Sequence, residues 1–139
     1  MCTEIDSKSK IDQNLIETIG ILEKNDIPYW LCQGTLLGII RDDELIPWDH
    51  DIDIAVWYSK KLNEKLKTIM TSHKYKLKNK YMINEDLITF VKEGGREVDI
   101  NCYQEKKMNN LDDIAYVKWS VPRNNFCKII DALSLAKNY

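Results

Sequence analysis

The segment IPWDHDIDIAVW, residues 46–57, is the most informative part of the chain. Its second half alternates between acidic and apolar residues, and successive side chains of a β-strand point to opposite faces of the sheet. Asp49, Asp51 and Asp53 are therefore expected on one face, if the strand begins that early, with the intervening isoleucines in the core. A buried strand with carboxylates along one face predicts a sheet that carries a polar site.

The two carboxylates of the D-x-D pair need a counter-charge. Carboxylates held close together in a partly apolar setting repel each other and stay partly protonated unless a positive charge joins them. A divalent cation at Asp51 and Asp53 would supply it, and oxygen-only ligands favour Mg²⁺ or Mn²⁺ over zinc. The competing interpretation is a solvated acidic strand end, because a lone D-x-D is common. The apolar run IAVW that follows favours a site, since a buried strand is a costly place for two charges.

The preceding segment CQGTLLGIIR, residues 32–41, has the pattern of a strand end, a glycine and a short helix. Gly34 would permit a tight turn, and the backbone amides of residues 35–37 could hold phosphate oxygens at the helix start. The Thr35 hydroxyl could cap the helix or donate to a phosphate, and Arg41 could add a fork of donors. Taken alone, the segment is better explained by an ordinary strand-to-helix turn with Arg41 in solvent.

A third carboxylate, Asp99, lies in REVDINCY, residues 96–103. The alternation predicts a strand whose apolar face is opposite Asp99. If Asp99 belongs to the site, this strand must lie alongside residues 51–57, and we predict that it does. The competing interpretation is the solvent face of an antiparallel strand, which would suit the neighbouring Glu97 and Asn101.

The whole chain, residues 1–139, is expected to form a single compact α/β (α+β) domain with a mixed sheet flanked by helices. Apolar residues at helical spacing predict a first helix over residues 9–25 with Ser9 as its N-cap. The hairpin before the third carboxylate is expected to turn at Gly94-Gly95. The remaining predicted helices cover residues 35–41, about 59–70 and a segment led by Pro122, and the predicted strands cover residues 29–32, 51–57, 75–79, 86–93 and 96–103.

Composition and charge exclude several classes of protein. The 139 residues carry a formal net charge of −2, so no broad positive field supports non-specific nucleic-acid binding. No apolar stretch is long enough to span a membrane, and the polar N-terminus lacks the apolar centre of a secretory signal. The four cysteines show neither zinc spacing nor a dense disulfide pattern, which predicts reduced thiols in a cytoplasmic protein.

Together, the glycine-threonine pair, the D-x-D strand and Asp99 resemble the signature of the nucleotidyltransferase fold. Residues 29–56 are more specifically similar to the LicD/fukutin-type family, whose pattern runs close to G-T-L-L-G-x-x-R-x-x-x-x-I-P-W-D-D-D-I-D. Residues 97–103 are a weaker match to a later strand of that family. His50 stands where the family usually has Asp, and the chain is shorter than typical members. The matching positions are Gly34, Thr35, Leu36, Leu37, Gly38, Arg41, Ile46, Pro47, Trp48, Asp49, Asp51, Ile52 and Asp53.

The resemblance implies transfer of a phospho-alcohol group, typically phosphocholine or ribitol phosphate. The donor would be a CDP-activated alcohol, and the acceptor a sugar hydroxyl of a glycan. It implies Mg²⁺ at Asp51, Asp53 and Asp99, with Asp99 also able to take the proton of the attacking hydroxyl. Gly34, Thr35 and Arg41 would bind the substrate phosphates. His50 is expected to point away from the metal, and the role of Asp49 is left open.

Two alternatives stay open. The same carboxylates could serve a small nucleotidyltransferase that moves an NMP from an NTP to a hydroxyl, or the chain could bind nucleotide without turnover. Trp48 and Trp57 could stack on a nucleobase, although packing is the preferred interpretation for both. Cys32 and Cys102 are expected in the core.

Overall fold

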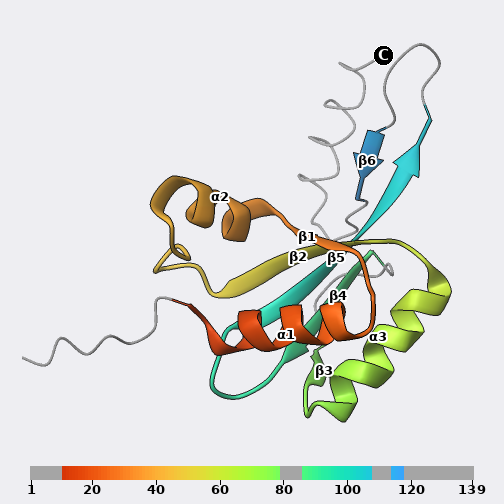
Figure 1. Cartoon of the computed structure of the whole chain (residues 1–139), viewed down its shortest axis with the longest axis horizontal. Helices are drawn as coiled ribbons and strands as arrows, with labels where there is room; N and C mark the ends of the chain where they lie inside the picture. The colour runs from red at the N-terminus through yellow and green to blue at the C-terminus, as the bar shows by residue number, and fades with distance from the viewer. Residues whose placement is uncertain (1–10, 79–85, 108–113, 118–139) are drawn as a thin grey trace, which may run out of the picture.

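The computed structural model describes residues 11–78, 86–107 and 114–117. In this part of the chain a mixed β-sheet packs against helices, which confirms the expected fold class (Figure 1). The predicted helix led by Pro122 lies outside the described residues. In chain order the elements are α1 (Gln13–Lys24), β1 (Tyr29–Leu31), α2 (Gln33–Asp42), β2 (Asp51–Trp57), α3 (Lys60–Ser72), β3 (Lys76–Lys78), β4 (Leu87–Val91), β5 (Glu97–Lys106) and β6 (Ile114–Tyr116).

The sheet has the strand order β1-β2-β5-β4-β3, and β6 pairs with the far end of β5. Strands β2 and β5 run parallel at the centre, and every other pairing is antiparallel. The predicted contact between residues 97–103 and 51–57 is therefore confirmed. Its register places Asp53 directly opposite Asp99.

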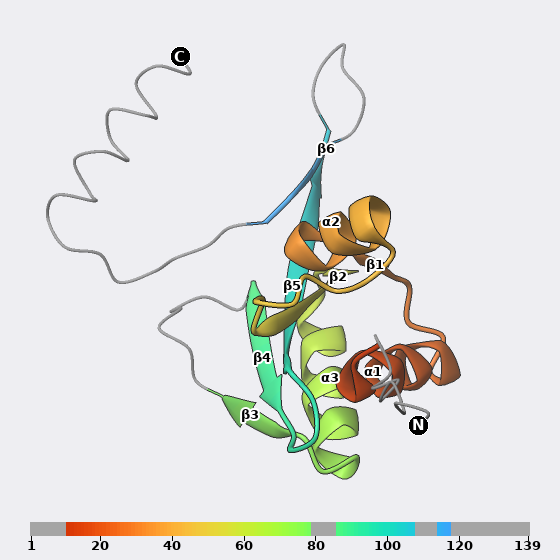
Figure 2. The same ribbon diagram turned by 90° about the vertical axis from the view of Figure 1, so that its left-hand side faces the viewer.

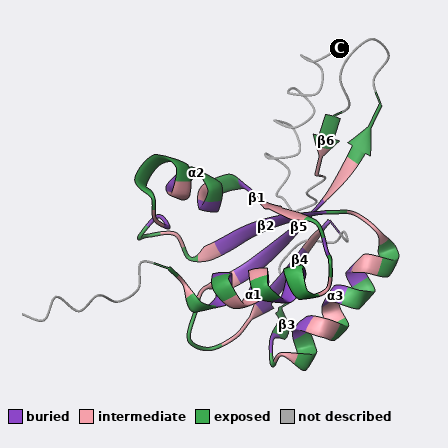
Figure 3. Cartoon of the chain, viewed as in Figure 1, coloured by how far each residue is buried: buried purple, intermediate pink, exposed green. Residues whose placement is uncertain are grey.

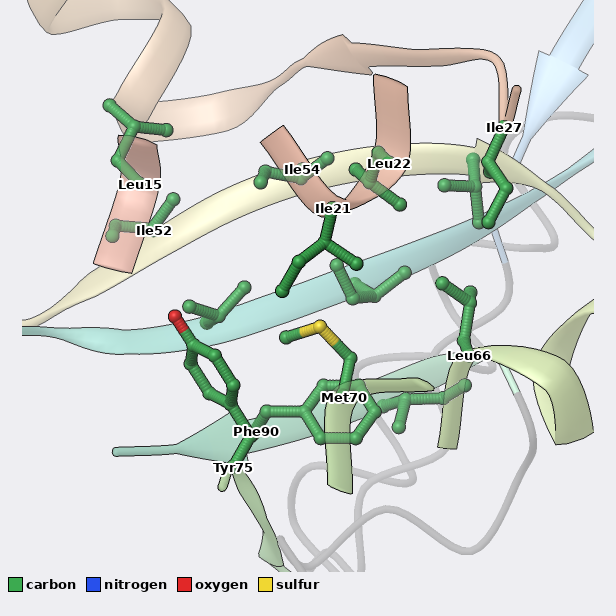
Figure 4. Packing of buried hydrophobic residues seen from close by; sticks show 14 of the residues in the cluster. Leu15, Ile21, Leu22, Ile27, Ile52, Ile54, Leu66, Met70, Tyr75 and Phe90 are labelled. Carbon is green, nitrogen blue, oxygen red and sulfur yellow. The ribbon is translucent and has the colours of Figure 1, made fainter. Parts of the chain in front are cut away.

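The hydrophobic core fills the space between one face of the sheet and two helices. Figure 2 shows α1 and α3 on the same side of the sheet, and Figure 3 shows that the central strands are buried along most of their length. Alternate residues of the central strands enter this core, as their sequence pattern predicts (Figure 4). The core includes Leu15, Ile21 and Leu22 of α1, Ile52, Ile54 and Val56 of β2, Leu66 and Met70 of α3, Ile88 and Phe90 of β4, and Val98, Ile100 and Cys102 of β5.

Helix α1 begins later than predicted, because Asp12 is its N-cap. The Asp12 side chain accepts a hydrogen bond from the Asn14 N–H at 2.8 Å, and its other oxygen accepts one from the Arg96 N–H at 3.0 Å. The predicted cap, Ser9, lies outside the described residues. One carboxylate thus starts a helix and also anchors the loop that precedes β5.

The connection between β4 and β5 is longer than the predicted two-residue turn. It covers residues 92–96, and the buried Asn14 amide bonds to both of its ends. Asn14 Nδ2 donates to the Lys92 carbonyl at 2.9 Å and to the Arg96 carbonyl at 3.0 Å. A side chain of α1 therefore ties the two ends of this loop together.

The loop between α2 and β2 folds back against α2 at Gly38. A Cβ at this position would lie 2.7 Å from the Glu44 carbonyl oxygen and 3.0 Å from the Ile46 backbone nitrogen, so only glycine permits the approach. Arg96 Nη1 holds the same loop by donating to the Ile46 carbonyl at 3.0 Å. The returning loop then brings Asp49 to the sheet.

Candidate active site

Two buried carboxylates lie side by side on the sheet face opposite the core. Asp53 and Asp99 are register partners on parallel strands, and their flanking residues Ile52, Ile54 and Ile100 point into the core. The exposed fractions are only 8% for Asp53 and 5% for Asp99. Carboxylates on adjacent strands at the same register are close neighbours, so this arrangement concentrates negative charge.

These carboxylates line a pocket of about 360 Å³. Asp49 reaches it from the loop before β2, and Asp51 reaches it from the first position of that strand. The described residues that line it include four aspartates and no Lys, Arg or His. Such a pocket is complementary to a cation, or to a cation that carries a phosphate group. The lining residues are Gln33, Gly34, Asp49, Asp51, Asp53, Leu87, Asp99 and Asn101.

The charge of Asp53 is unfavourable in this setting. Burial is the main cause that raises its pKa from 3.8 to about 6, and the negative charges of Asp51, Asp99 and Asp49 raise it further. The hydrogen bond from Asn101 acts in the opposite direction. A bound cation would relieve the penalty, because it would favour the ionised form of Asp53.

Each buried carboxylate accepts a hydrogen bond from a neutral side chain. Asn101 Nδ2 donates to Asp53 Oδ1 at 3.2 Å, and the Thr89 hydroxyl donates to Asp99 Oδ1 at 2.6 Å. Neither donor was identified from the sequence. The competing interpretation of residues 96–103 placed Asn101 on a solvent-exposed strand face. Its exposed fraction is 1%, so that interpretation is wrong. The signal for Asn101 was its position two residues after Asp99, on the same strand face.

Gly34 provides space for a carboxylate. A Cβ at Gly34 would lie 2.4 Å from Asp49 Oδ2, so the glycine permits close approach of that side chain. The predicted tight-turn role is wrong in detail, because the positive φ of 50° falls on Gln33. Helix α2 also begins earlier than predicted, since the Leu36 N–H donates to the Cys32 carbonyl at 3.2 Å. The amides that precede the helical hydrogen bonds therefore belong to residues 33–35 and not to residues 35–37.

The structure places Thr35 beside the pocket and Arg41 away from it. The buried Thr35 hydroxyl accepts a hydrogen bond from the Asp53 N–H at 2.8 Å and does not cap the helix, whose N-cap is Cys32. Arg41 lies in the last turn of α2, where it forms an ion pair with Asp42 at 2.7 Å. It is not among the residues that line the pocket. The phosphate-binding roles of Thr35 and Arg41 stay predictions.

The chemistry of the pocket suits a hard divalent cation, although the ligand set is not preformed. Among residues 11–78, 86–107 and 114–117, no three His, Cys, Asp or Glu side chains are already positioned to hold a metal ion. The pocket nevertheless offers carboxylate oxygens from Asp51, Asp53 and Asp99, the donor type that Mg²⁺ and Mn²⁺ prefer. Their role as ligands stays a prediction. His50 is exposed and does not line the pocket, in keeping with the expectation that it points away.

Aromatic residues lie beyond the aspartates along β2 and β5, and on the neighbouring strand β1. Trp57 packs against Trp30 with ring centroids 4.9 Å apart, and Trp30 lies 5.3 Å from the ring of Tyr103. Trp57 therefore packs against a neighbouring ring as expected, although 43% of the residue is exposed. The packing expected of Trp48 is wrong, because 74% of that residue is exposed. Cys32 and Cys102 are buried, as expected.

The chain is similar to known proteins over part of its length. Residues 26–127 match the family model described as "LicD/FKTN/FKRP, nucleotidyltransferase domain". The chain is 44% identical over 39 residues to the ribitol 5-phosphate transferases FKRP of Mus musculus and Homo sapiens, an alignment that covers 28% of this chain and 8% of each relative. An uncharacterized protein of Rickettsia prowazekii is 39% identical over 51 residues, covering 37% of this chain and 19% of that protein. The chain thus spans a small part of the curated relatives it matches.

Solved structures support the fold. The lincosamide antibiotic adenylyltransferase LnuA, bound to lincomycin, aligns with a TM-score of 0.53 at 15% identity, covering 76% of this chain and 68% of LnuA. The antibiotic-resistance factor ANT(2'')-Ia aligns with a TM-score of 0.51 at 13% identity, covering 77% of this chain and 54% of ANT(2'')-Ia.

None of the helices in the described ranges has both the length and the apolar character needed to cross a bilayer. The family match covers most of the chain and includes all four aspartates of the pocket. The chain therefore belongs to the LicD/FKTN/FKRP nucleotidyltransferase-domain family, a group of transferases of phosphorus-containing groups.

Proposed function

We propose that this chain transfers a phospho-alcohol group, such as phosphocholine or ribitol phosphate, from a CDP-activated donor to a sugar hydroxyl of a glycan. The observation that carries the proposal is the register pairing of Asp53 with Asp99 at the centre of the sheet, in a pocket that also contains Asp49 and Asp51. Family membership and the relatives named ribitol 5-phosphate transferases support the choice of transferred group.

In the proposed reaction, the acceptor hydroxyl oxygen bonds to the phosphorus that carries the alcohol, and the bond from that phosphorus to CMP breaks. Asp99 takes the proton of the hydroxyl. The amides of residues 33–35, at the start of α2, bind phosphate oxygens. Asp51, Asp53 and Asp99 would hold Mg²⁺ or Mn²⁺, and a bound ion would supply positive charge at the diphosphate.

The transfer of an NMP from an NTP is the alternative that the same carboxylates could serve. The two reactions leave different products, because a CDP-alcohol releases CMP and an NTP releases pyrophosphate. The fold similarity to LnuA does not choose between them, since it extends to the fold alone. The cytoplasmic location also stays a prediction.

Product analysis tests the proposal. The chain is incubated with Mg²⁺, a mixture of sugar acceptors, and either CDP-choline, CDP-ribitol, CTP or ATP. We expect CMP from a CDP-alcohol, no pyrophosphate from either NTP, and loss of CMP release in Asp53→Asn. Asp86→Asn is the matched control, because Asp86 is also buried but does not line the pocket. Release of pyrophosphate without CMP would replace the proposal with the alternative.

A further inference from the structure

We infer that Thr89 and Asn101 are positioning residues, whose neutral hydrogen-bond donors orient the Asp99 and Asp53 carboxylates for a divalent cation. The inference rests on the proposed function, because it concerns the residues that orient two of the proposed metal ligands, Asp53 and Asp99. Thr89 lies outside both segments that resemble the family and Asn101 lies in the weaker one, residues 97–103, so neither is a position of the longer motif, residues 29–56. Both are instead brought to the carboxylates by strand pairing.

Thr89 orients Asp99 across an antiparallel pair. The register of β4 and β5 places Thr89 directly opposite Asp99, so that the two side chains share a face of the sheet. The hydroxyl donates to Asp99 Oδ1 at 2.6 Å, and only 2% of Thr89 is exposed. With little water to compete, this bond restricts rotation of the carboxylate.

Asn101 orients Asp53 across the parallel pair. Its Nδ2 donates to Asp53 Oδ1, while its own Oδ1 accepts a hydrogen bond from Gln33 Nε2 at 3.3 Å. The donor from Gln33 fixes the orientation of the amide, because the carbonyl end must face Gln33 and the N–H end must face the carboxylate. A chain of contacts from the start of α2 thus holds Asp53.

The neutrality of both donors is the reason to assign them to a cation site. Lys or Arg could orient a carboxylate equally well, but its charge would neutralise the site and compete with a cation. The described lining of the pocket contains neither residue type. Threonine and asparagine hold the oxygens and leave the negative charge in place, which is what partners of metal ligands commonly do.

Titration of the purified full chain with Mn²⁺ alone, followed by calorimetry, tests the inference. Thr89→Val keeps the shape and removes the hydroxyl, and it should weaken Mn²⁺ binding by about 10–100-fold, as should Asn101→Leu. Thr89→Ser keeps the hydroxyl and should bind Mn²⁺ much more tightly than Thr89→Val. Thr18→Val is the matched control, because Thr18 is fully buried on α1 away from the pocket, and its affinity for Mn²⁺ should equal that of the wild type.

The outcomes separate this inference from the proposed function. If folded Thr89→Val and Asn101→Leu bind Mn²⁺ as the wild type does while Asp53→Asn loses it, the inference is wrong and the metal site stands. If Thr18→Val weakens binding equally, the effect is general loosening of the core and the inference is also wrong. If the wild type binds no Mn²⁺, both the inference and the metal-dependent function fail. If Thr89→Val does not fold, the affinity of Asn101→Leu for Mn²⁺ decides the question, with the same expected loss of about 10–100-fold.

Discussion

Asp53 is the residue at which stability and function conflict. Its pKa rises from 3.8 to about 6, chiefly because it is buried. Between pH values of about 4 and about 6, the Asp53 carboxyl is ionised in the unfolded chain and still protonated in the folded chain. The free energy of unfolding therefore falls as the pH rises from about 4 to about 6, and above that range the penalty is constant.

Replacing this carboxylate should therefore stabilise the metal-free protein. In EDTA, Asp53→Asn should raise the free energy of unfolding by about 1–3 kcal/mol at pH 7.5, and by much less at pH 4, where the wild-type carboxyl is protonated. Urea unfolding at the two pH values measures both differences. An equal gain at pH 4 and pH 7.5 would show that ionisation of Asp53 is not the cause.

Gly34 offers a second test at the level of a single residue. Gly34→Ala places a Cβ where the Asp49 carboxylate now lies, 2.4 Å from Oδ2, so that carboxylate must move. We expect a loss of about 10–100-fold in kcat/KM for the transfer reaction. Steady-state assays of CMP release measure it.

Gly20→Ala is the matched control for that substitution. Gly20 is inside α1, and apart from its chain neighbours and the adjacent helix backbone no atom of the described residues lies within 4 Å of a Cβ at this position. Alanine there should leave activity unchanged and add about 0.5–1 kcal/mol to stability. Wild-type kcat/KM in Gly34→Ala would show that the position of Asp49 does not affect the reaction.

At the level of elements, the Thr35 hydroxyl connects α2 to β2 through the backbone of Asp53. Thr35→Val removes the acceptor and leaves that buried N–H unsatisfied, which should lower the free energy of unfolding by about 1–3 kcal/mol. Thr35→Ser keeps the acceptor and should lose less. Urea unfolding in EDTA measures the effect apart from metal binding, and a valine variant as stable as the wild type would contradict it.

The strands show what the sequence could and could not predict. Alternation within residues 51–57 and 97–103 identified the faces of both strands correctly. Successive side chains of a strand point to opposite faces, so the strand's own sequence shows which residues share a face. Thr89 could not be assigned in this way, since its contact with Asp99 depends on the register of a different strand. Long-range pairing of this kind has no local signal.

The glycine-threonine motif was located correctly but explained incompletely. Gly34 and Thr35 do lie at the start of α2, yet their contacts are with Asp49 and the Asp53 backbone. Both contacts depend on the loop that returns from α2, which a sequence pattern does not describe. Arg41, matched by the same motif, lies at the other end of the helix, paired with Asp42.

On the scale of the whole molecule, the fold separates stability from chemistry. Helices α1 and α3 cover one face of the sheet and bury its apolar residues (Figure 2). The opposite face carries the aspartates, the start of α2 and the loop before β2, which together line the pocket. Substitutions in the pocket are therefore expected to change activity without loss of the core.

A diffraction experiment examines the proposed metal site itself. Crystals grown with Mn²⁺ and CDP, measured at a wavelength where manganese scatters anomalously, should show a peak bounded by Asp51, Asp53 and Asp99, at about 2–2.3 Å from their oxygens. Asp53→Asn crystals grown in the same way should lack it. The account would be contradicted if saturating Mn²⁺ gave no peak in the wild type, or gave a peak that none of these three carboxylates touches.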